Sequence, residues 1–250
     1  MLLEGRNAVI YGAGGAIGGA VARAFAAEGA RVFLTGRTRA KLDLVAEEIR
    51  SAGGAAEAAE VDALDEQAVD EHADAVAAQG GLDVSVNLIA HGDVHGTPMA
   101  QMRPEDYARP VEIAVRTTFL TSRAAARHMI RQRSGVILAF GGSGDPMRDY
   151  YLGGTQVAFE AIESMRRQLA AELGPYGVRV VTLRTGGVPE TIPAGADGRA
   201  EIVGGIESQT MTGRAATLED VGNVAAFVAS DRARTMTAAT ANISAGALVD

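Results

Sequence analysis

A cluster of five glycines follows the first run of strand-forming residues, and it limits the folds open to this chain more than any other feature. The chain reads NAVIY over residues 7–11 and then GAGGAIGGA, with glycine at Gly12, Gly14, Gly15, Gly18 and Gly19. Residues without a Cβ allow a tight turn that brings backbone N–H groups and a helix N-terminus close to an anion. The sequence therefore predicts a phosphate-binding strand–turn–helix unit, with a plain tight connection as the alternative reading.

The rest of the chain alternates short apolar runs with stretches of helical period, which is typical of repeated β-α-β units and a parallel sheet. Strands are predicted over 7–11, 31–35, 56–61, 83–88, 136–140, 179–183 and 239–243. No linker or internal repeat divides the 250 residues. We therefore predict a single α/β domain over 1–250, a Rossmann-like, doubly wound, seven-stranded parallel sheet. The irregular segment 186–213, rich in Gly, Thr and Pro, is a predicted substrate lid.

Composition excludes several classes of protein. The chain has 31 acidic and 23 basic side chains and a net charge of -8, so it lacks the positive field that a nucleic-acid or anionic-membrane binder needs. It has no cysteine, which excludes disulfides and thiolate chemistry. Neither a secretory signal nor an apolar run of membrane-spanning length is present, so we expect a cytoplasmic protein whose partners are small molecules and copies of itself.

The residues after the second predicted strand indicate which dinucleotide binds. Folds that bind NAD usually carry an acidic residue there for the ribose hydroxyls, whereas this chain has Gly36, followed by Arg37 and Arg39. A guanidinium can pair with a 2′-phosphate. The sequence therefore favours NADP(H) over NAD(H), against the alternative that these arginines are ordinary surface charges at a helix start.

Taken together, these motifs resemble the short-chain dehydrogenase/reductase family over essentially the whole chain. YGAGGAIG resembles the family's T-G-x-x-x-G-x-G turn, and LAAELGPYGVRVV and SDRARTMTAATANIS resemble later segments. The resemblance implies the strand order 3-2-1-4-5-6-7 and a homodimer or homotetramer formed through the helices at 103–132 and 155–173. The cofactor-binding residues that the turn and the resemblance imply are Gly12, Gly14, Gly15, Ala16, Ile17, Gly18, Arg37, Asp62, Ala63, Asn87, Ala90 and Gly186.

The family's catalytic positions do not match. A tyrosine that transfers protons near neutral pH needs a nearby cation to stabilise its phenolate, and the family places a lysine four residues after it. Counted back from AAELGPYG, these two positions fall on Thr155 and Phe159, and Lys41 is the only lysine in the chain. The family's asparagine falls on Ala114, and its serine strand reads VILAFGGSG, with Ser143 one place late. The chain therefore resembles a divergent member without the Tyr-x-x-x-Lys pair.

Replacement residues are available near the expected substrate side. We predict Tyr151 as the acid, Ser143 as the donor that orients the carbonyl, and Arg148 as the cation that depresses the phenol's pKa. His91 and His95 are second candidates, because histidine transfers protons readily at neutral pH. Together with Asp93 they would converge poorly on a metal ion, so no metal site is predicted.

Three functions stay open at this point. The first is an atypical NADP(H)-dependent carbonyl/alcohol oxidoreductase with a non-standard proton donor and a mainly neutral small-molecule substrate. The second is a non-redox enzyme on the same fold, catalysing a dehydration, isomerisation or cyclisation, since fold does not dictate function. The third is a catalytically inert nucleotide-binding or sensor protein.

Overall fold

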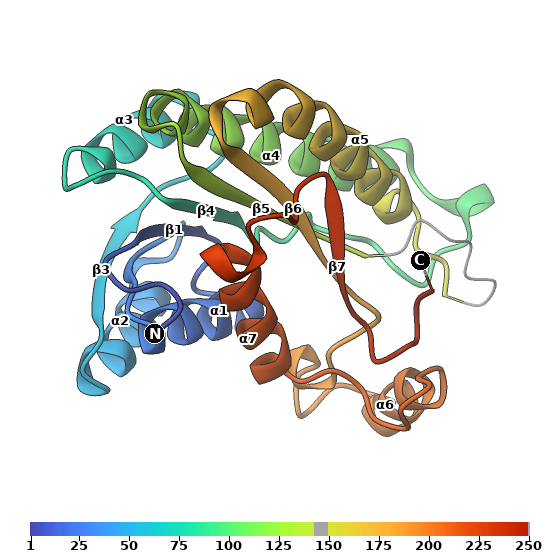
Figure 1. Ribbon diagram of the computed structural model, residues 1–250. Coiled ribbons are helices and arrows are strands. Elements are labelled where there is room, and N and C mark those ends of the chain that lie inside the picture. Colours follow the sequence, from blue (N-terminus) through green and yellow to red (C-terminus); the bar gives the residue numbers. More distant parts are fainter. Residues whose placement is uncertain (143–149, 250) are drawn as a thin grey trace.

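Within residues 1–142 and 150–249, which the computed structural model describes, seven parallel strands form one sheet in the order β3-β2-β1-β4-β5-β6-β7 (Figure 1). The strands are β1 (Asn7–Tyr11), β2 (Arg31–Gly36), β3 (Ala55–Glu60), β4 (Val84–Asn87), β5 (Gly135–Gly141), β6 (Val178–Thr185) and β7 (Ala239–Ile243). The predicted strands and the predicted order are confirmed. The order reverses between β1 and β4, and ligands of open α/β sheets bind at the carboxyl ends of strands beside such a reversal.

Helices cover both faces of the sheet. They are α1 (Ala16–Ala27), α2 (Arg39–Ser51), α3 (Glu66–Ala77), α4 (Pro104–Gln132), α5 (Thr155–Leu173), α6 (Arg199–Ser208) and α7 (Leu218–Ala229). Figure 1 shows α3, α4 and α5 on one face and α1, α2 and α7 on the other. Short 3₁₀ turns lie at Met99–Gln101, Gly174–Tyr176, Pro189–Thr191 and Asp231–Ala233. None of the helices in the described part of the chain is both long and apolar enough to cross a bilayer.

The apolar character of the central strands follows from this layering. Each residue of β1 is buried, because helices cover the sheet on both sides and leave no face for water. Ile10 packs into the core under α1 and α7, whereas the neighbouring Val9 packs into the core under α3 and α4. Alternate residues of a strand point to opposite faces, so one apolar run serves two cores.

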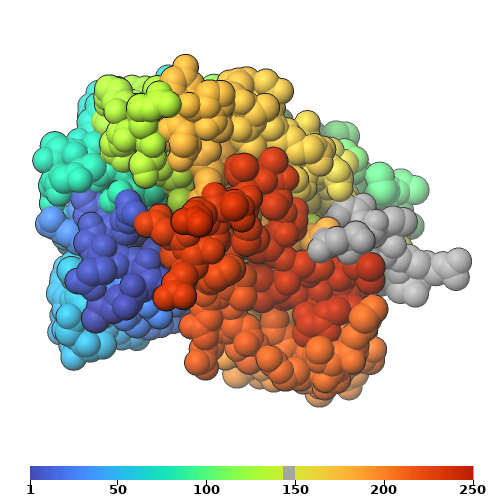
Figure 2. Space-filling model, viewed as in Figure 1, coloured from blue at the N-terminus to red at the C-terminus, as the bar shows by residue number. Residues whose placement is uncertain are grey.

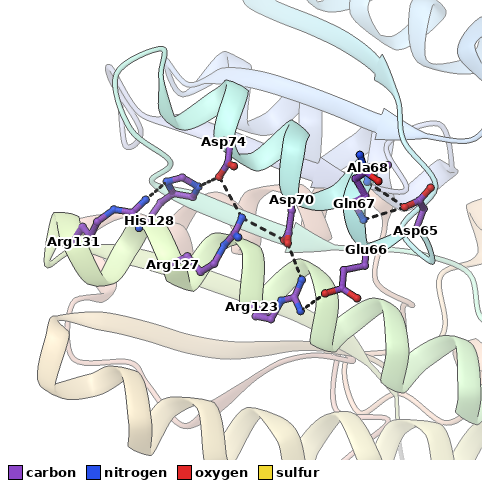
Figure 3. Close-up of polar contacts among 10 residues, drawn as sticks. All are labelled: Asp65, Glu66, Gln67, Ala68, Asp70, Asp74, Arg123, Arg127, His128 and Arg131. Atoms are coloured by element: carbon purple, nitrogen blue, oxygen red, sulfur yellow. Dashed lines mark hydrogen bonds and ion pairs between the residues drawn. The ribbon is translucent and has the colours of Figure 1, made fainter.

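A ladder of charged side chains ties α3 to α4 (Figure 3). Arg123 donates to Glu66 and Asp70, Arg127 donates to Asp74, His128 donates through Nε2 to Asp74, and Arg131 donates to Nδ1 of His128. Single exposed ion pairs contribute only about 0–1 kcal/mol, but shared carboxylates link these pairs into one network. The network fixes the position of α3, whose N-terminal end lies next to the candidate site.

The predicted lid contains a helix that the sequence pattern did not predict. Helix α6 has no buried residue, so its apolar side chains follow no helical stripe that would reveal it. The C-terminal segment (red in Figure 2) lies against the lid (orange), where the Met211 N–H donates to the Ala245 carbonyl at 3.0 Å. The segment 186–213 is therefore tied by a hydrogen bond to the residues that follow β7.

Candidate active site

The glycine-rich turn needs its glycines for steric reasons at two positions. Gly12 has φ of +84°, and a Cβ there would lie 2.5 Å from the Leu88 carbonyl oxygen on the neighbouring strand end. A Cβ on Gly18 would lie 2.2 Å from the Gly12 carbonyl oxygen. The N–H groups of Gly12 and Ala13 both donate to the Thr35 carbonyl, which pins the turn to β2. The turn can thus close tightly only with glycine at these places.

Helix α1 begins without the usual side-chain cap. Its N-cap is Gly15, none of the described side chains accepts a hydrogen bond from its first turn, and that turn holds no acidic residue. The first N–H groups of a helix have no partner within the helix and carry a partial positive charge. The start of α1 is therefore built to receive an anion.

A cavity of about 290 Å³ lies beside this turn at the carboxyl ends of the strands. Seven of the predicted cofactor residues line it, namely Gly12, Gly14, Gly15, Arg37, Asp62, Ala63 and Ala90. The lining also contains residues that the sequence did not single out for binding, among them Thr38, Lys41, Ile113 and Thr117. Lys41 lies in the first turn of α2, and its place just after the second predicted strand could have identified it as a second cation. The structure thus brings the predicted pieces of a dinucleotide site together.

The lining of this cavity fits a dinucleotide in its chemistry. Open N–H groups at the start of α1 suit a pyrophosphate, and the Arg37 and Lys41 side chains add positive charge on the side of β2. Asp62 is placed by a local turn, in which its carboxylate accepts from the Leu64 N–H at 3.0 Å. The Asp62 carboxylate, the Arg37 and Lys41 side chains and the start of α1 therefore surround the same cavity.

The other predicted cofactor residues lie outside that lining. Ala16, Ile17 and Gly18 form the first turn of α1. Asn87, buried at the end of β4, donates to the hydroxyls of Thr117 and Thr118 on α4 and so joins the strand to that helix. Gly186 follows β6, where a Cβ would crowd Ala247 at 2.9 Å.

The positions that stand for the family's tyrosine and lysine lie at the start of α5. Thr155 is the first residue of this helix and is only 3% exposed, and Phe159 follows one turn later. A Cβ on Gly142 would overlap the Phe159 ring, so the aromatic ring packs directly on the end of β5. Ala114, at the asparagine position, is buried against apolar neighbours that include Ile162. Apolar side chains that pack against their neighbours therefore occupy the positions that the resemblance assigns to the lysine and the asparagine.

The hydroxyl of Thr155 joins the start of α5 to the segment 91–98 that follows β4. It donates to Oδ1 of Asp93 at 2.9 Å, and Nε2 of His95 lies 3.3 Å from the same oxygen. The Gly96 N–H donates to the Tyr151 carbonyl at 3.2 Å and holds the two segments together at a second point. A carboxylate, a hydroxyl and an imidazole are therefore in contact at the position that the resemblance assigns to the family's tyrosine.

His91 stands beside this group in a drier environment. It is 8% exposed and its ring meets the edge of the Phe159 ring, with centroids 6.2 Å apart. Burial lowers the pKa of His91, and the nearby Asp93 charge opposes that shift only in part. The imidazole of His91 is therefore favoured in its neutral form.

The predicted replacement residues have different outcomes. Tyr151 is 44% exposed and has φ of +48°, a left-handed conformation that is uncommon outside glycine. Its hydroxyl stays a predicted acid. Ser143 and Arg148 lie outside the described residues. No group of three His, Asp or Glu side chains in the described chain is arranged to hold a metal ion.

Comparison with known proteins places this geometry among dehydrogenases and reductases. A family model described as enoyl-(acyl carrier protein) reductase matches residues 12–247. An uncharacterized oxidoreductase of Methylorubrum extorquens is 35% identical, with 98% of each chain covered. L-rhamnose 1-dehydrogenase (NAD(P)(+)) of Azotobacter vinelandii is 31% identical over 100% of this chain and 99% of its own. A short-chain type dehydrogenase/reductase from Mycobacterium ulcerans superposes with a TM-score of 0.91 at 29% identity, covering 99% of this chain and 91% of that one.

Proposed function

Because the chain belongs to the short-chain dehydrogenase/reductase family, we propose that it is an NADP(H)-dependent enzyme that interconverts a carbonyl and an alcohol with a proton donor other than the family's tyrosine. Membership makes the chain an oxidoreductase of this type with a nicotinamide dinucleotide as cofactor. The preference for the phosphorylated cofactor, the unusual donor and the substrate class are the proposed parts.

The observation that carries the cofactor preference is the pair of cations at the end of β2. Arg37 and Lys41 line the cavity on the side where Gly36 leaves no carboxylate to bind ribose hydroxyls. A 2′-phosphate there would accept from a guanidinium, and hydrogen bonds to charged groups contribute roughly 1.5–3 kcal/mol. NAD(H) has no group that could use these cations in the same way.

Calorimetric titration with NADPH and NADH tests this preference. We expect Arg37→Glu to weaken NADPH binding by about tenfold to a hundredfold, as the loss of such a charged hydrogen bond implies. NADH binding should change little. Arg39→Glu is the matched control, because Arg39 is exposed, pairs with Asp43 and does not line the cavity. Equal losses for both cofactors in Arg37→Glu would contradict the proposal.

The proposed substrate is a mainly neutral small molecule that the segment 186–213 covers. Two of the few charged side chains in that segment are already engaged with the backbone. Glu190 accepts from the Leu218 N–H, and Arg199 donates to the carbonyls of Ile192 and Pro189. Because these two charged side chains bind backbone groups, they are not free to pair with a charged substrate, which supports a neutral one.

The proton donor is proposed to come from the segments around Thr155. Tyr151 is the candidate that the sequence favours, and Tyr151→Phe tests it: the variant loses turnover and keeps its nucleotide affinity only if the Tyr151 hydroxyl is the acid. The replaced tyrosine and lysine positions also leave room for a non-redox reaction on the same fold. Turnover of a substrate without any change in nicotinamide absorbance would favour that second function.

The proposed assembly is a homo-oligomer that forms through α4 and α5. Val115 and Phe119 on α4 and Val157 on α5 are exposed apolar side chains on these two helices. Light scattering on the purified protein should give a mass of two or four chains, and Phe119→Glu should shift that mass toward one chain. A monomeric wild-type protein would contradict this part of the proposal.

A further inference from the structure

We propose that His95 is the proton donor to the substrate's carbonyl oxygen in place of the family's tyrosine, and that Thr155 and Asp93 hold its ring. The inference rests on the proposed function, because it assigns a group to the reaction proposed above. It concerns residues that lie in contact at the start of α5, although 60 positions separate His95 from Thr155 in the chain.

The hydrogen bonds around Thr155 decide which ring nitrogen of His95 carries a fixed proton. The hydroxyl of Thr155 has one proton, which it donates to Asp93 Oδ1. The oxygen of Thr155 must then accept from Nε2–H of His95. Both the neutral and the charged ring keep a proton on Nε2 in this arrangement, so the proton that is gained and lost sits on Nδ1.

The surrounding loop is built to keep His95 at this place. Gly92 and Gly96 have φ of +75° and +80°, and they bend the segment 91–98 back over the start of α5. The Gly96 N–H bond to the Tyr151 carbonyl closes that bend, and the rings of His95 and Tyr150 meet edge to face with centroids 6.4 Å apart. Leu88, Ile89 and Ala90 line the cavity, and His95 lies on the segment that follows them in the chain.

The same assignment explains why a lysine is absent. A phenol has a pKa near 10 and needs a neighbouring cation to work at neutral pH, whereas an imidazole titrates between pH 5 and 8 without one. The lysine position is free to hold Phe159, which packs on Gly142 and His91 instead. Thr155 itself is an unsuitable donor, because its hydroxyl is buried and already committed to Asp93.

The proton transfer balances in the direction of reduction. A reduced nicotinamide held in the cavity would supply the hydride, that is, one hydrogen nucleus with two electrons, to the carbonyl carbon. The π electron pair of the carbonyl then forms an O–H bond with the proton from Nδ1 of His95. The electron pair of the broken N–H bond stays on Nδ1, and the neutral ring regains a proton from water, to which the His95 side chain is exposed.

Kinetics with NADPH and a panel of neutral aldehydes and ketones test the assignment, using the full-length protein. His95→Asn should lower kcat for reduction by about a hundredfold or more, since general acid catalysis contributes typically 10²–10⁴-fold, while NADPH affinity stays within about twofold of wild type. The matched control is His72→Asn on α3, which should leave kcat unchanged. Full kcat in His95→Asn would overturn the proposal, as would a loss of turnover confined to Tyr151→Phe.

The pH profile adds a readout that damage to the fold would not imitate. The wild-type rate of reduction should fall as pH rises through the range of histidine, because the donor must carry its proton, and the profile should flatten in His95→Asn. Other titratable groups adjoin this segment, namely Asp93 and His91 within it, Tyr150 before α5, and Arg109 on α4 with its partner Asp106. The profile of His95→Asn measures what these groups contribute, and an unchanged slope would overturn the proposal.

Nitrogen-15 NMR of the four histidines tests the positioning role without any turnover. Neutral His95 should be in the Nε2–H form in wild type and in Thr155→Ser, which keeps the hydroxyl, and should become a mixture of tautomers in Thr155→Val. A wild-type His95 with its proton on Nδ1 would overturn the arrangement. If no carbonyl compound oxidises bound NADPH, the proposed function fails and the donor role fails with it, whereas the tautomer result separately decides the hydrogen bonds.

Discussion

Helices α1 and α7 lie side by side on the same face of the sheet, have 12 residues each, and begin in opposite ways (Figure 1). At α7, Thr217 accepts from the Asp220 N–H and Asp220 accepts from the Thr217 N–H, so the helix closes its own start. At α1, Gly15 offers no side chain. In the part of the chain that the structure describes, the first N–H groups of α1 have no side-chain acceptor, so they are available to a ligand or to water, whereas those of α7 are already satisfied.

The largest expected effect comes from breaking the turn that precedes α1. In Gly18→Ala the new Cβ would lie 2.2 Å from the Gly12 carbonyl oxygen, and relief requires movement of the backbone. We expect loss of measurable NADPH binding and a destabilisation of about 2–3 kcal/mol, the scale of severe overpacking. Calorimetry and denaturant unfolding measure the two effects.

Gly53→Ala is the control for that variant. Gly53 also has a left-handed φ, of +86°, but nothing lies within 4 Å of its would-be Cβ. It should therefore show only backbone strain, about 1 kcal/mol, with normal NADPH binding. Similar binding losses in both variants would mean that the close approach of Gly18 to Gly12 is not what forms the site.

A smaller effect is expected from giving α1 an acidic first turn. Ala16→Asp places a carboxylate at the exposed first residue of the helix, where it favours the free helix by roughly 0.3–1 kcal/mol and repels a pyrophosphate. NADPH binding should weaken by about tenfold or more, while the midpoint of thermal unfolding without ligand rises slightly. Ala16→Asn has a similar size without the charge and should bind nearly as wild type. Unchanged affinity in Ala16→Asp would remove the start of α1 from the phosphate site.

The smallest effect on binding is expected at α7. Asp220→Asn removes a capping carboxylate and should cost about 1 kcal/mol of stability without changing NADPH affinity. The hydrogen bond from Arg214, together with that from the Thr217 backbone, lowers the pKa of Asp220 from its usual 3.8 to about 2. The contribution of the Asp220 carboxylate to the free energy of unfolding is therefore present above pH 3.8 and is lost as the pH falls toward 2. The free energy of unfolding of Asp220→Asn should lack this dependence on pH. A weaker affinity of this variant for NADPH would contradict the view that α1 and not α7 contributes to the dinucleotide site.

The sequence predicts the fold well because the fold depends on local periodicity. β1 and β7 have the predicted bounds, and α5 begins and ends at the predicted Thr155 and Leu173. Helix α6 escaped prediction because it packs no face against the core. Elements whose apolar side chains enter the core leave a pattern in the chain, and exposed elements leave none.

The candidate site likewise contains one part that the sequence could predict and one part that it could not. Gly12 and Arg37 belong to one β-α-β unit, so their meeting at a cavity could be expected from order alone. The contact of His95 with Thr155 could not be expected. It depends on the path of an irregular segment whose bends at Gly92 and Gly96 have no periodic signature. The resemblance assigns the family's tyrosine position to Thr155, and only the structure shows which polar side chains contact Thr155 there.

The position of His95 on a loop also bears on how such a chain can diverge. The segment 91–98 contributes no residue to the two large cores, and its contacts with the region around α5 include those of His91 with Phe159 and those of Asp93, His95 and Gly96. Under the proposed assignment, a substitution at His95 would change the proton donor and leave the strands and covering helices intact. A lineage can therefore exchange one acid for another on this scaffold without passing through an unstable intermediate sequence.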